Sequence, residues 1–388
     1  MKKTRALVAT VTAGAMVLSM AACGSSAYQE TTAAAATEAA GTAAAGETAA
    51  AQEATGTVSS SDLKVMLETP VMSLDPQQAT DGTSFEVMAN YTDGLTQMDD
   101  SGAAVAAIAE SWETSDDGLT WTFHLRKDAK WSNGTPVTAK DFVFGWQRAV
   151  DPDVASEYAY MLSDIGQIKN AAEIIDGTKD KSELGVTAVD DNTLQVELNA
   201  PVSYFLSLMY FPTFYPVNEE FFYSCPDSYG TSPETTLSNG AFVLDSYEPA
   251  ATEIHLTKNA DYFDADNIKL AGIDYQVIQD SQQSLLSYQS GDLDMTLLNG
   301  DQVDQVKDDP AFKAVGAGYL WYVTPNISAV PELANDNIRK ALTFAIDRTA
   351  ICEDVLKDGS KPTYTAVPMD FAAGPDGSDF SADQSKFQ

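Results

Sequence analysis

The chain has 388 residues, of which 57 are Asp or Glu and 22 are Lys or Arg, so its formal net charge is −35 at neutral pH. Phosphate binding needs a basic surface, and no Lys/Arg cluster lies beyond the first few residues, which argues against a nucleic-acid partner. Two histidines rule out a His-rich metal site, and three cysteines do not indicate a disulfide framework. A single bridge between Cys225 and Cys352 stays open.

The first residues have the pattern of a bacterial lipoprotein signal. Lys2, Lys3 and Arg5 precede an apolar run over residues 6–20, and two alanines lead directly into Cys23. The run is too short for a permanent transmembrane helix and fits a cleaved export peptide over residues 1–22. We expect Cys23 to become the acylated N-terminus, with an ordinary secretory signal as the alternative.

Residues 23–57 carry this lipidated cysteine and a segment of mostly Ala, Thr, Gly, Ser, Glu and Gln. Too few bulky apolar groups are present to offset the entropy of ordering the chain, so we expect a flexible tether. The globular part then begins near residue 58. Because it exceeds 300 residues, we expect two or more lobes rather than a single core.

Strand, turn and helix signals follow one another between residues 119 and 152. Alternation of apolar and polar residues over 119–126 predicts a half-buried strand whose apolar face is Leu119, Trp121, Phe123 and Leu125. Asn133 and Gly134 predict a turn. Thr138 with Asp141 predicts a capping-box start of a helix that closes before Pro152.

Sequence signatures of catalysis are missing. The chain has no G-x-S-x-G, H-E-x-x-H, P-loop or G-x-G-x-x-G motif. His124 and His255 each fall within an alternating strand pattern, where a solvent-facing or structural role is expected. Abundant carboxylates leave surface glycoside hydrolysis as the alternative outside binding, but they are not informative by themselves.

Residues 109–152, AESWETSDDGLTWTFHLRKDAKWSNGTPVTAKDFVFGWQRAVDP, resemble the signature of family 5 bacterial extracellular solute-binding proteins. The resemblance is closest to the oligopeptide-binding lipoproteins of ABC importers and runs from about residue 62 to about residue 365. Ala260 and Phe263 depart from the family's usual Pro and Trp but keep the apolar character of a packed turn. Further matching blocks are residues 73–76, 91–95, 184–186, 193–198, 200–205, 238–242, 258–263, 290–295 and 335–348.

This resemblance implies an α/β fold of the periplasmic-binding-protein type, type II, with two lobes around a cleft and an extra inserted domain. The implied N-terminal lobe is residues 58–110 plus 232–325, the inserted domain is 111–231, and the C-terminal lobe starts at 326. Family members continue well beyond residue 388, so we expect a C-terminal lobe that is incomplete in this chain. A chain cut inside this lobe would be poorly stable and bind little, and a non-functional remnant is one of the alternatives.

The function implied by the resemblance is capture of oligopeptides in the cleft and delivery to the permease subunits of an ABC importer. No enzyme activity, cofactor or metal is implied, and we expect a monomer held by its lipid on the extracytoplasmic face of the cell membrane. Alternatives within the family are receptors for dipeptides, oligosaccharides or signalling peptides.

The candidate ligand-binding residues also follow from the resemblance. Residues 80–82 correspond to a loop at the cleft edge, and two tyrosines of the inserted domain to positions that meet the ligand. Aromatic residues near 320 lie at the crossing into the second lobe. The alternative for the aromatic side chains is packing within a lobe. The candidates are Thr80, Asp81, Gly82, Tyr158, Tyr160, Tyr319, Trp321 and Tyr322.

Overall fold

The computed structural model describes residues 9–10, 62–99, 102–316, 318–369, 371 and 378–381. The chain divides into two compact units, one built on residues 60–315 and the other on residues 316–388. No helix within the described ranges has the length and apolar character needed to cross a membrane. The predicted signal, Cys23 and the tether lie outside the described residues, apart from the short strand β1 (Ala9–Thr10).

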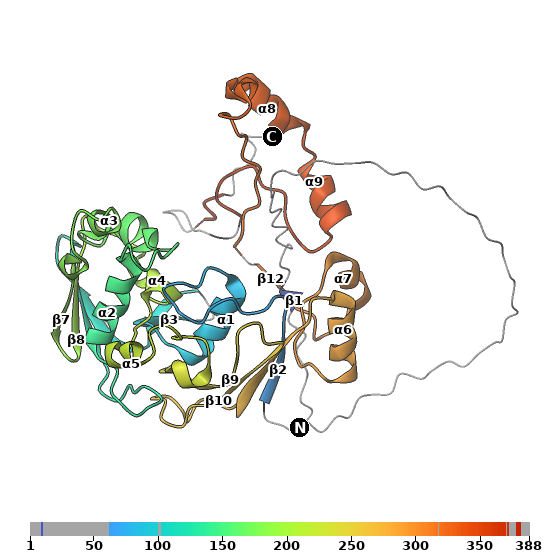
Figure 1. Ribbon diagram of the computed structural model, residues 1–388. Coiled ribbons are helices and arrows are strands. Elements are labelled where there is room, and N and C mark those ends of the chain that lie inside the picture. Colours follow the sequence, from blue (N-terminus) through green and yellow to red (C-terminus); the bar gives the residue numbers. More distant parts are fainter. Residues whose placement is uncertain are drawn as a thin grey trace, which may run out of the picture. The chain divides into compact units, whose positions relative to one another are not determined.

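The first unit contains two four-stranded sheets (Figure 1). One has the strand order β2, β11, β10, β9, with β2 parallel to β11 and the other neighbours antiparallel. The second has the order β5, β6, β8, β7 and is antiparallel throughout. Two short pairs, β3 with β4 and β1 with β12, complete the described strands. Their bounds are Asp62–Leu67 (β2), Thr96–Met98 (β3), Ala104–Ala106 (β4), Ala109–Thr114 (β5), Thr120–Leu125 (β6), Val186–Asp190 (β7), Thr193–Glu197 (β8), Phe242–Ser246 (β9), Glu253–Lys258 (β10), Gly272–Val277 (β11) and Ala314–Val315 (β12).

Helices connect and cover these sheets, and most of them are short. The α-helices are Gly82–Tyr91 (α1), Ala139–Val150 (α2), Ala171–Ile175 (α3), Phe205–Leu208 (α4), Glu219–Ser224 (α5), Ser281–Ser290 (α6), Gly300–Val306 (α7), Asp336–Ala345 (α8) and Arg348–Ala350 (α9). The 3₁₀ and π turns are Met161–Ile165 (η1), Lys181–Glu183 (η2), Pro212–Phe214 (η3), Pro233–Thr235 (η4), Pro331–Ala334 (η5) and Ile351–Leu356 (η6).

The local predictions for residues 119–152 are confirmed. The predicted strand is β6, with Phe123 and Leu125 buried in the core, and the predicted turn places Gly134 at φ +85°, which favours glycine. Helix α2 begins after Thr138, whose backbone amide donates to the Asp141 carboxylate at 2.7 Å. These features depend on contacts between near neighbours, which is why the sequence pattern is sufficient to predict them.

Each sheet of the first unit has its own hydrophobic core. The antiparallel sheet of β5 to β8 packs with α2 and encloses large rings such as Trp131, Trp146 and Phe142. The other sheet packs against α1 through Val87, Met88 and Tyr91. Burial of such large apolar side chains gives each module its main stabilisation, about 25 cal/mol per Å² of apolar surface removed from water.

The second unit differs in its packing. Among its described residues, no apolar side chain is buried, and α8 leaves Leu342 and Phe344 exposed. Cys352 of this unit and Cys225 of the first unit are both free thiols.

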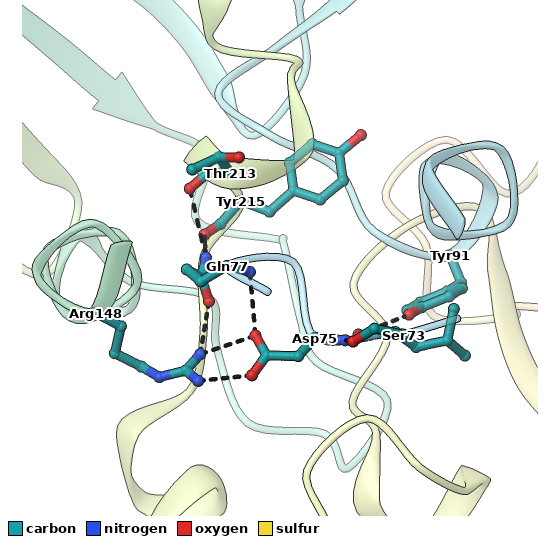
Figure 2. Close-up of polar contacts among 8 residues, drawn as sticks. Ser73, Asp75, Gln77, Tyr91, Arg148, Thr213 and Tyr215 are labelled. Carbon is teal, nitrogen blue, oxygen red and sulfur yellow. Dashed lines mark hydrogen bonds and ion pairs between the residues drawn. The ribbon is translucent and has the colours of Figure 1, made fainter. Parts of the chain in front are cut away.

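A buried ion pair joins the loop after β2 to helix α2 (Figure 2). Arg148 donates from both terminal nitrogens to the Asp75 carboxylate, at 3.1 and 2.7 Å, and also to the side-chain oxygen of Gln77 at 2.6 Å. Gln77 in turn donates its amide to the carbonyls of Thr213 and Tyr215. Since Asp75 and Arg148 are each 5% exposed, this network fixes the chain that leads into α1.

A second buried carboxylate, Asp93, has no hydrogen-bonded cation among the described residues. It accepts from the Tyr262 hydroxyl at 2.8 Å and from the Gln97 amide at 2.7 Å. Burial raises the pKa of Asp93 from 3.8 to about 6, although both hydrogen bonds and the charge of Arg126 act in the opposite direction. Asp93 therefore favours the folded state more when protonated than when ionised.

Replacing Arg148 by Met should destabilise the first unit by about 3–5 kcal/mol, because Asp75 would remain buried without its partner. Urea unfolding followed by tryptophan fluorescence measures this change. Lys140→Met is the matched control, since its pair with Asp191 (2.8 Å) is exposed and its loss should change stability far less than the loss of Arg148. Equal losses in the two variants would contradict a structural role specific to the buried pair.

Asp93→Asn should remove a pH-dependent contribution to the free energy of unfolding. The folded-state pKa of about 6 lies above the ordinary 3.8, so ionisation of Asp93 lowers stability as pH rises through this window. The difference corresponds to about 3 kcal/mol. Unfolding free energies of the wild type and the variant, measured from pH 3.5 to 7.5, should therefore diverge in favour of the variant. A difference that stays constant with pH would show that Asp93 has an ordinary pKa.

Candidate functional site

The predicted loop at residues 80–82 forms the start of helix α1. Asp81 is the N-cap, and its carboxylate accepts from the backbone amide of Ser84 at 2.8 Å and from the Ser84 hydroxyl at 2.6 Å. The Ser84 oxygen accepts in turn from the amides of Met72 and Ser73. Both carboxylate oxygens of Asp81 thus have a structural use, while contact with a ligand stays a prediction. Thr80 and Gly82 are exposed beside it.

The predicted tyrosines of the inserted segment lie close to this helix. Tyr158 contacts the ring of Phe85, one turn into α1, with ring centroids 5.7 Å apart. It also contacts Tyr160 at 5.8 Å and Phe211 at 5.1 Å. Phe85 and Phe211 contact each other at 5.2 Å, which closes the group. We call Phe85, Tyr158, Tyr160 and Phe211 the aromatic cluster.

The aromatic cluster connects the two sheet modules of the first unit and still presents surface to solvent. Tyr160 is 45% exposed, and the other three rings are partly buried. Tyr158 therefore packs within the first unit, which is the alternative to ligand binding. The exposed part of the Tyr160 ring can still stack on a ligand. Phe85 and Phe211 were not among the predicted residues. Their only sequence signal was aromatic character, which most often indicates core packing.

The three aromatic residues predicted near 320 lie in the second unit. Tyr319, Trp321 and Tyr322 are 68%, 56% and 76% exposed and stand outside any described helix or strand. The structure gives them no partner ring within the described part of this unit. Residues 80–82, Tyr158 and Tyr160 all lie in the first unit. A contribution of Tyr319, Trp321 and Tyr322 to a ligand site stays a prediction.

Metal binding has no support in the described part of the chain. No group of three or more His, Cys, Asp or Glu side chains there is arranged to hold a metal ion. His255 instead pairs with Asp274 across β10 and β11, with Nδ1 2.7 Å from Oδ1. The candidate site consists of aromatic rings, a capped helix start and hydroxyl groups, which suits binding of an organic ligand.

Comparison with known proteins decides the family. Residues 103–386 match the sequence profile of bacterial extracellular solute-binding proteins, family 5. The chain belongs to this family. Its fold is the α/β fold of periplasmic binding proteins, and this agrees with the resemblance seen in the sequence. Membership also places the protein among the extracellular solute-binding proteins.

Individual relatives support this placement. The chain is 36% identical to the oligopeptide-binding protein OppA of Bacillus subtilis over 312 residues, which are 79% of this chain and 56% of the relative. It is 34% identical to the dipeptide-binding protein of Lactococcus lactis, over 84% of this chain and 60% of the relative. The structure of peptide-bound OppA from Listeria monocytogenes matches with a TM-score of 0.71 and 36% identity, over 83% of this chain and 64% of that one. The chain thus spans less than two thirds of the length of these relatives.

Asp81→Ala should destabilise the first unit by about 1 kcal/mol, because the amide of Ser84 would lose its acceptor. Asp81→Asn keeps an acceptor at this position and should retain most of the stability. Thermal or urea unfolding of the two variants checks the difference. If both variants are as stable as the wild type, the carboxylate is not needed as a cap.

Proposed function

We propose that this chain belongs to the receptor of an ABC importer that captures oligopeptides outside the cell and delivers them to a membrane permease. The observation that carries the proposal is its identity of 33–37% to solved peptide receptors over more than four fifths of the chain. These structures are of the substrate-binding domain of an oligopeptide ABC transporter, of a peptide-bound OppA and of the pheromone receptor PrgZ. The role is binding and delivery, without chemistry on the peptide.

Within the first unit, we assign the ligand-facing surface to the aromatic cluster and the exposed start of α1. The Tyr160 ring offers a flat apolar face that accepts many side chains, while its hydroxyl can exchange hydrogen bonds with a peptide backbone. Such contacts tolerate variation in the peptide sequence, because they use features that all peptides share. In our proposal, Tyr319, Trp321 and Tyr322, at the crossing into the second lobe, are further ligand contacts.

The remaining assignments complete the proposal. Residues 58–110 with 232–325 form the N-terminal lobe, 111–231 form the inserted domain, and the chain from 326 onward belongs to the second lobe. Cys23 carries the lipid that holds the mature protein on the extracytoplasmic face of the cell membrane, and residues 24–57 form the tether. The receptor acts as a monomer that docks on its permease.

One relative suggests a different ligand class. The chain is 36% identical, over 73% of its length, to a probable deoxycholate-binding periplasmic protein of Escherichia coli. An apolar steroid would also stack on an open tyrosine face such as that of Tyr160. Peptides remain the proposed ligand because the relatives named for peptide binding include both curated proteins and peptide-bound structures.

The test is binding of a mixed peptide pool by the purified chain, followed by native mass spectrometry and by calorimetry with the peptides recovered. Tyr160→Ala should weaken binding about tenfold, because loss of one aromatic contact costs roughly 1–2 kcal/mol. Tyr223→Ala is the control, since Tyr223 is 60% exposed on α5, away from the aromatic cluster. Binding of deoxycholate or an oligosaccharide without any peptide would refute the proposed ligand class.

A further inference from the structure

The segment between α2 and α3 has an unusual backbone. Ala155, Gln167 and Asn170 have φ angles of +53°, +53° and +67°, which lie in the left-handed region that favours glycine. In the described part of the chain, five residues other than glycine have a positive φ, and three of them are these. Left-handed backbone is therefore concentrated in the short stretch of residues 155–170.

Two further unfavourable features lie in the same stretch. Turn η1 is a π turn, after which the amide of Gly166 donates to the carbonyl of Met161 at 2.8 Å. Such turns are rare and are frequent at functional sites. The hydroxyl oxygen of Ser156 is buried and has no hydrogen-bond partner among the described residues, which costs free energy. Strain of this kind persists only where the surrounding structure fixes it, and it gathers at ligand-binding segments.

The surrounding structure does fix this segment. Leu162 and Ile168 are fully buried in the core of the antiparallel sheet module. Between them, the carbonyl of Gln167 accepts from the backbone amide of Asn199 at 2.7 Å, and the amide of Ile168 donates to the carbonyl of Leu162 at 2.9 Å. The buried side chains and these backbone bonds hold Gln167 in its left-handed conformation.

The three left-handed residues differ in what a glycine would change. Asn tolerates this backbone conformation, and the Asn170 side chain makes two hydrogen bonds of 2.6 Å that glycine would lose. Ala155 is exposed and contributes only a methyl group. The Gln167 side chain donates to the carbonyl of Asp164 at 2.8 Å, in a bond that is exposed to solvent. Ala155 and Gln167 are therefore the positions where glycine would remove strain at little cost.

These two positions stand on either side of the candidate tyrosines. Tyr158 packs against Phe85 of α1, with ring centroids 5.7 Å apart, and Tyr160 is 45% exposed. A backbone that is fixed at Ala155 and at Gln167 presents the Tyr160 ring in one orientation before a ligand arrives. Preorganisation of this kind lowers the entropy that is lost on binding.

We propose that Ala155 and Gln167 are positioning residues, whose left-handed backbone holds Tyr158 and Tyr160 ready for a peptide at a cost in the stability of the first unit. The assignment of the tyrosines to the ligand surface rests on the proposed function. Relief of the strain should then move two properties in opposite directions: the protein becomes more stable, and it binds peptide less tightly. A merely structural role would change stability alone.

The experiment uses the purified chain with Ala155→Gly and Gln167→Gly, singly and combined. Each single substitution should raise the melting temperature by about 2–4 °C. The double variant should bind a peptide recovered from the mixed pool about three- to tenfold more weakly in calorimetry, because the segment must be ordered on binding. Ala250→Gly is the matched control, since Ala250 has φ +63° outside this segment. It should raise the melting temperature similarly and leave the affinity unchanged.

A second measurement needs no peptide. The amides of Gly166 and Ile168 both donate to carbonyls within the segment, so their hydrogen exchange reports its local opening. In the unliganded double variant, both amides should exchange at least about threefold faster than in the wild type, although the melting temperature is higher. Ala250→Gly should leave their exchange rates unchanged.

Two results would overturn the proposal: glycine variants that are no more stable than the wild type, or exchange rates in the segment that match those of Ala250→Gly. Peptide binding separates the positioning role from the proposed function. If Tyr160→Ala weakens binding but the double glycine variant does not, the positioning role is refuted and the peptide site stands. If the wild type binds no peptide, the proposed function fails, and the exchange rates still decide whether Ala155 and Gln167 hold the segment rigid.

Discussion

The buried pair of Asp75 and Arg148 is the interaction on which the first unit depends. The buried arginine is tolerated because a carboxylate and an amide oxygen accept hydrogen bonds from its terminal nitrogens and its guanidinium stacks on Phe222. The same carboxylate accepts from the backbone amide of Gln77, so the pair also sets the course of the loop. One ion pair thus fixes helix α2, the loop after β2 and the turn that begins α1.

The loop that this ion pair holds contributes to two different surfaces of the first unit. The loop beyond Asp75 leads into the N-cap of α1 and then to Phe85, which contacts the aromatic cluster. The residues before it, Met72 and Ser73, line a cavity of about 340 Å³ together with Asp75 and Arg148. A loop that buried hydrogen bonds hold in a fixed geometry keeps the contacts of α1 preorganised, and preorganised contacts cost less entropy on binding.

Polar groups in the first unit are used in two different ways. Arg148 and Asp75 neutralise each other, whereas Asp93 accepts hydrogen bonds from the uncharged side chains of Tyr262 and Gln97. Desolvation without a bonded cation is what raises the pKa of Asp93 toward 6. Protonation of Asp93 relieves a buried charge, so acid favours the folded state at this position.

The sequence alone determined the features that depend on near neighbours. The alternation around Phe123, the turn at Gly134 and the cap at Thr138 were predictable because periodicity and capping act over a few residues. The resemblance to family 5 also pointed to residues 80–82 and to Tyr158 and Tyr160. Only the tertiary structure decided that Arg148 meets Asp75, 73 residues away, and that Phe85 and Phe211 close the aromatic cluster. Contacts between distant segments follow from how the modules pack, and no local pattern encodes them.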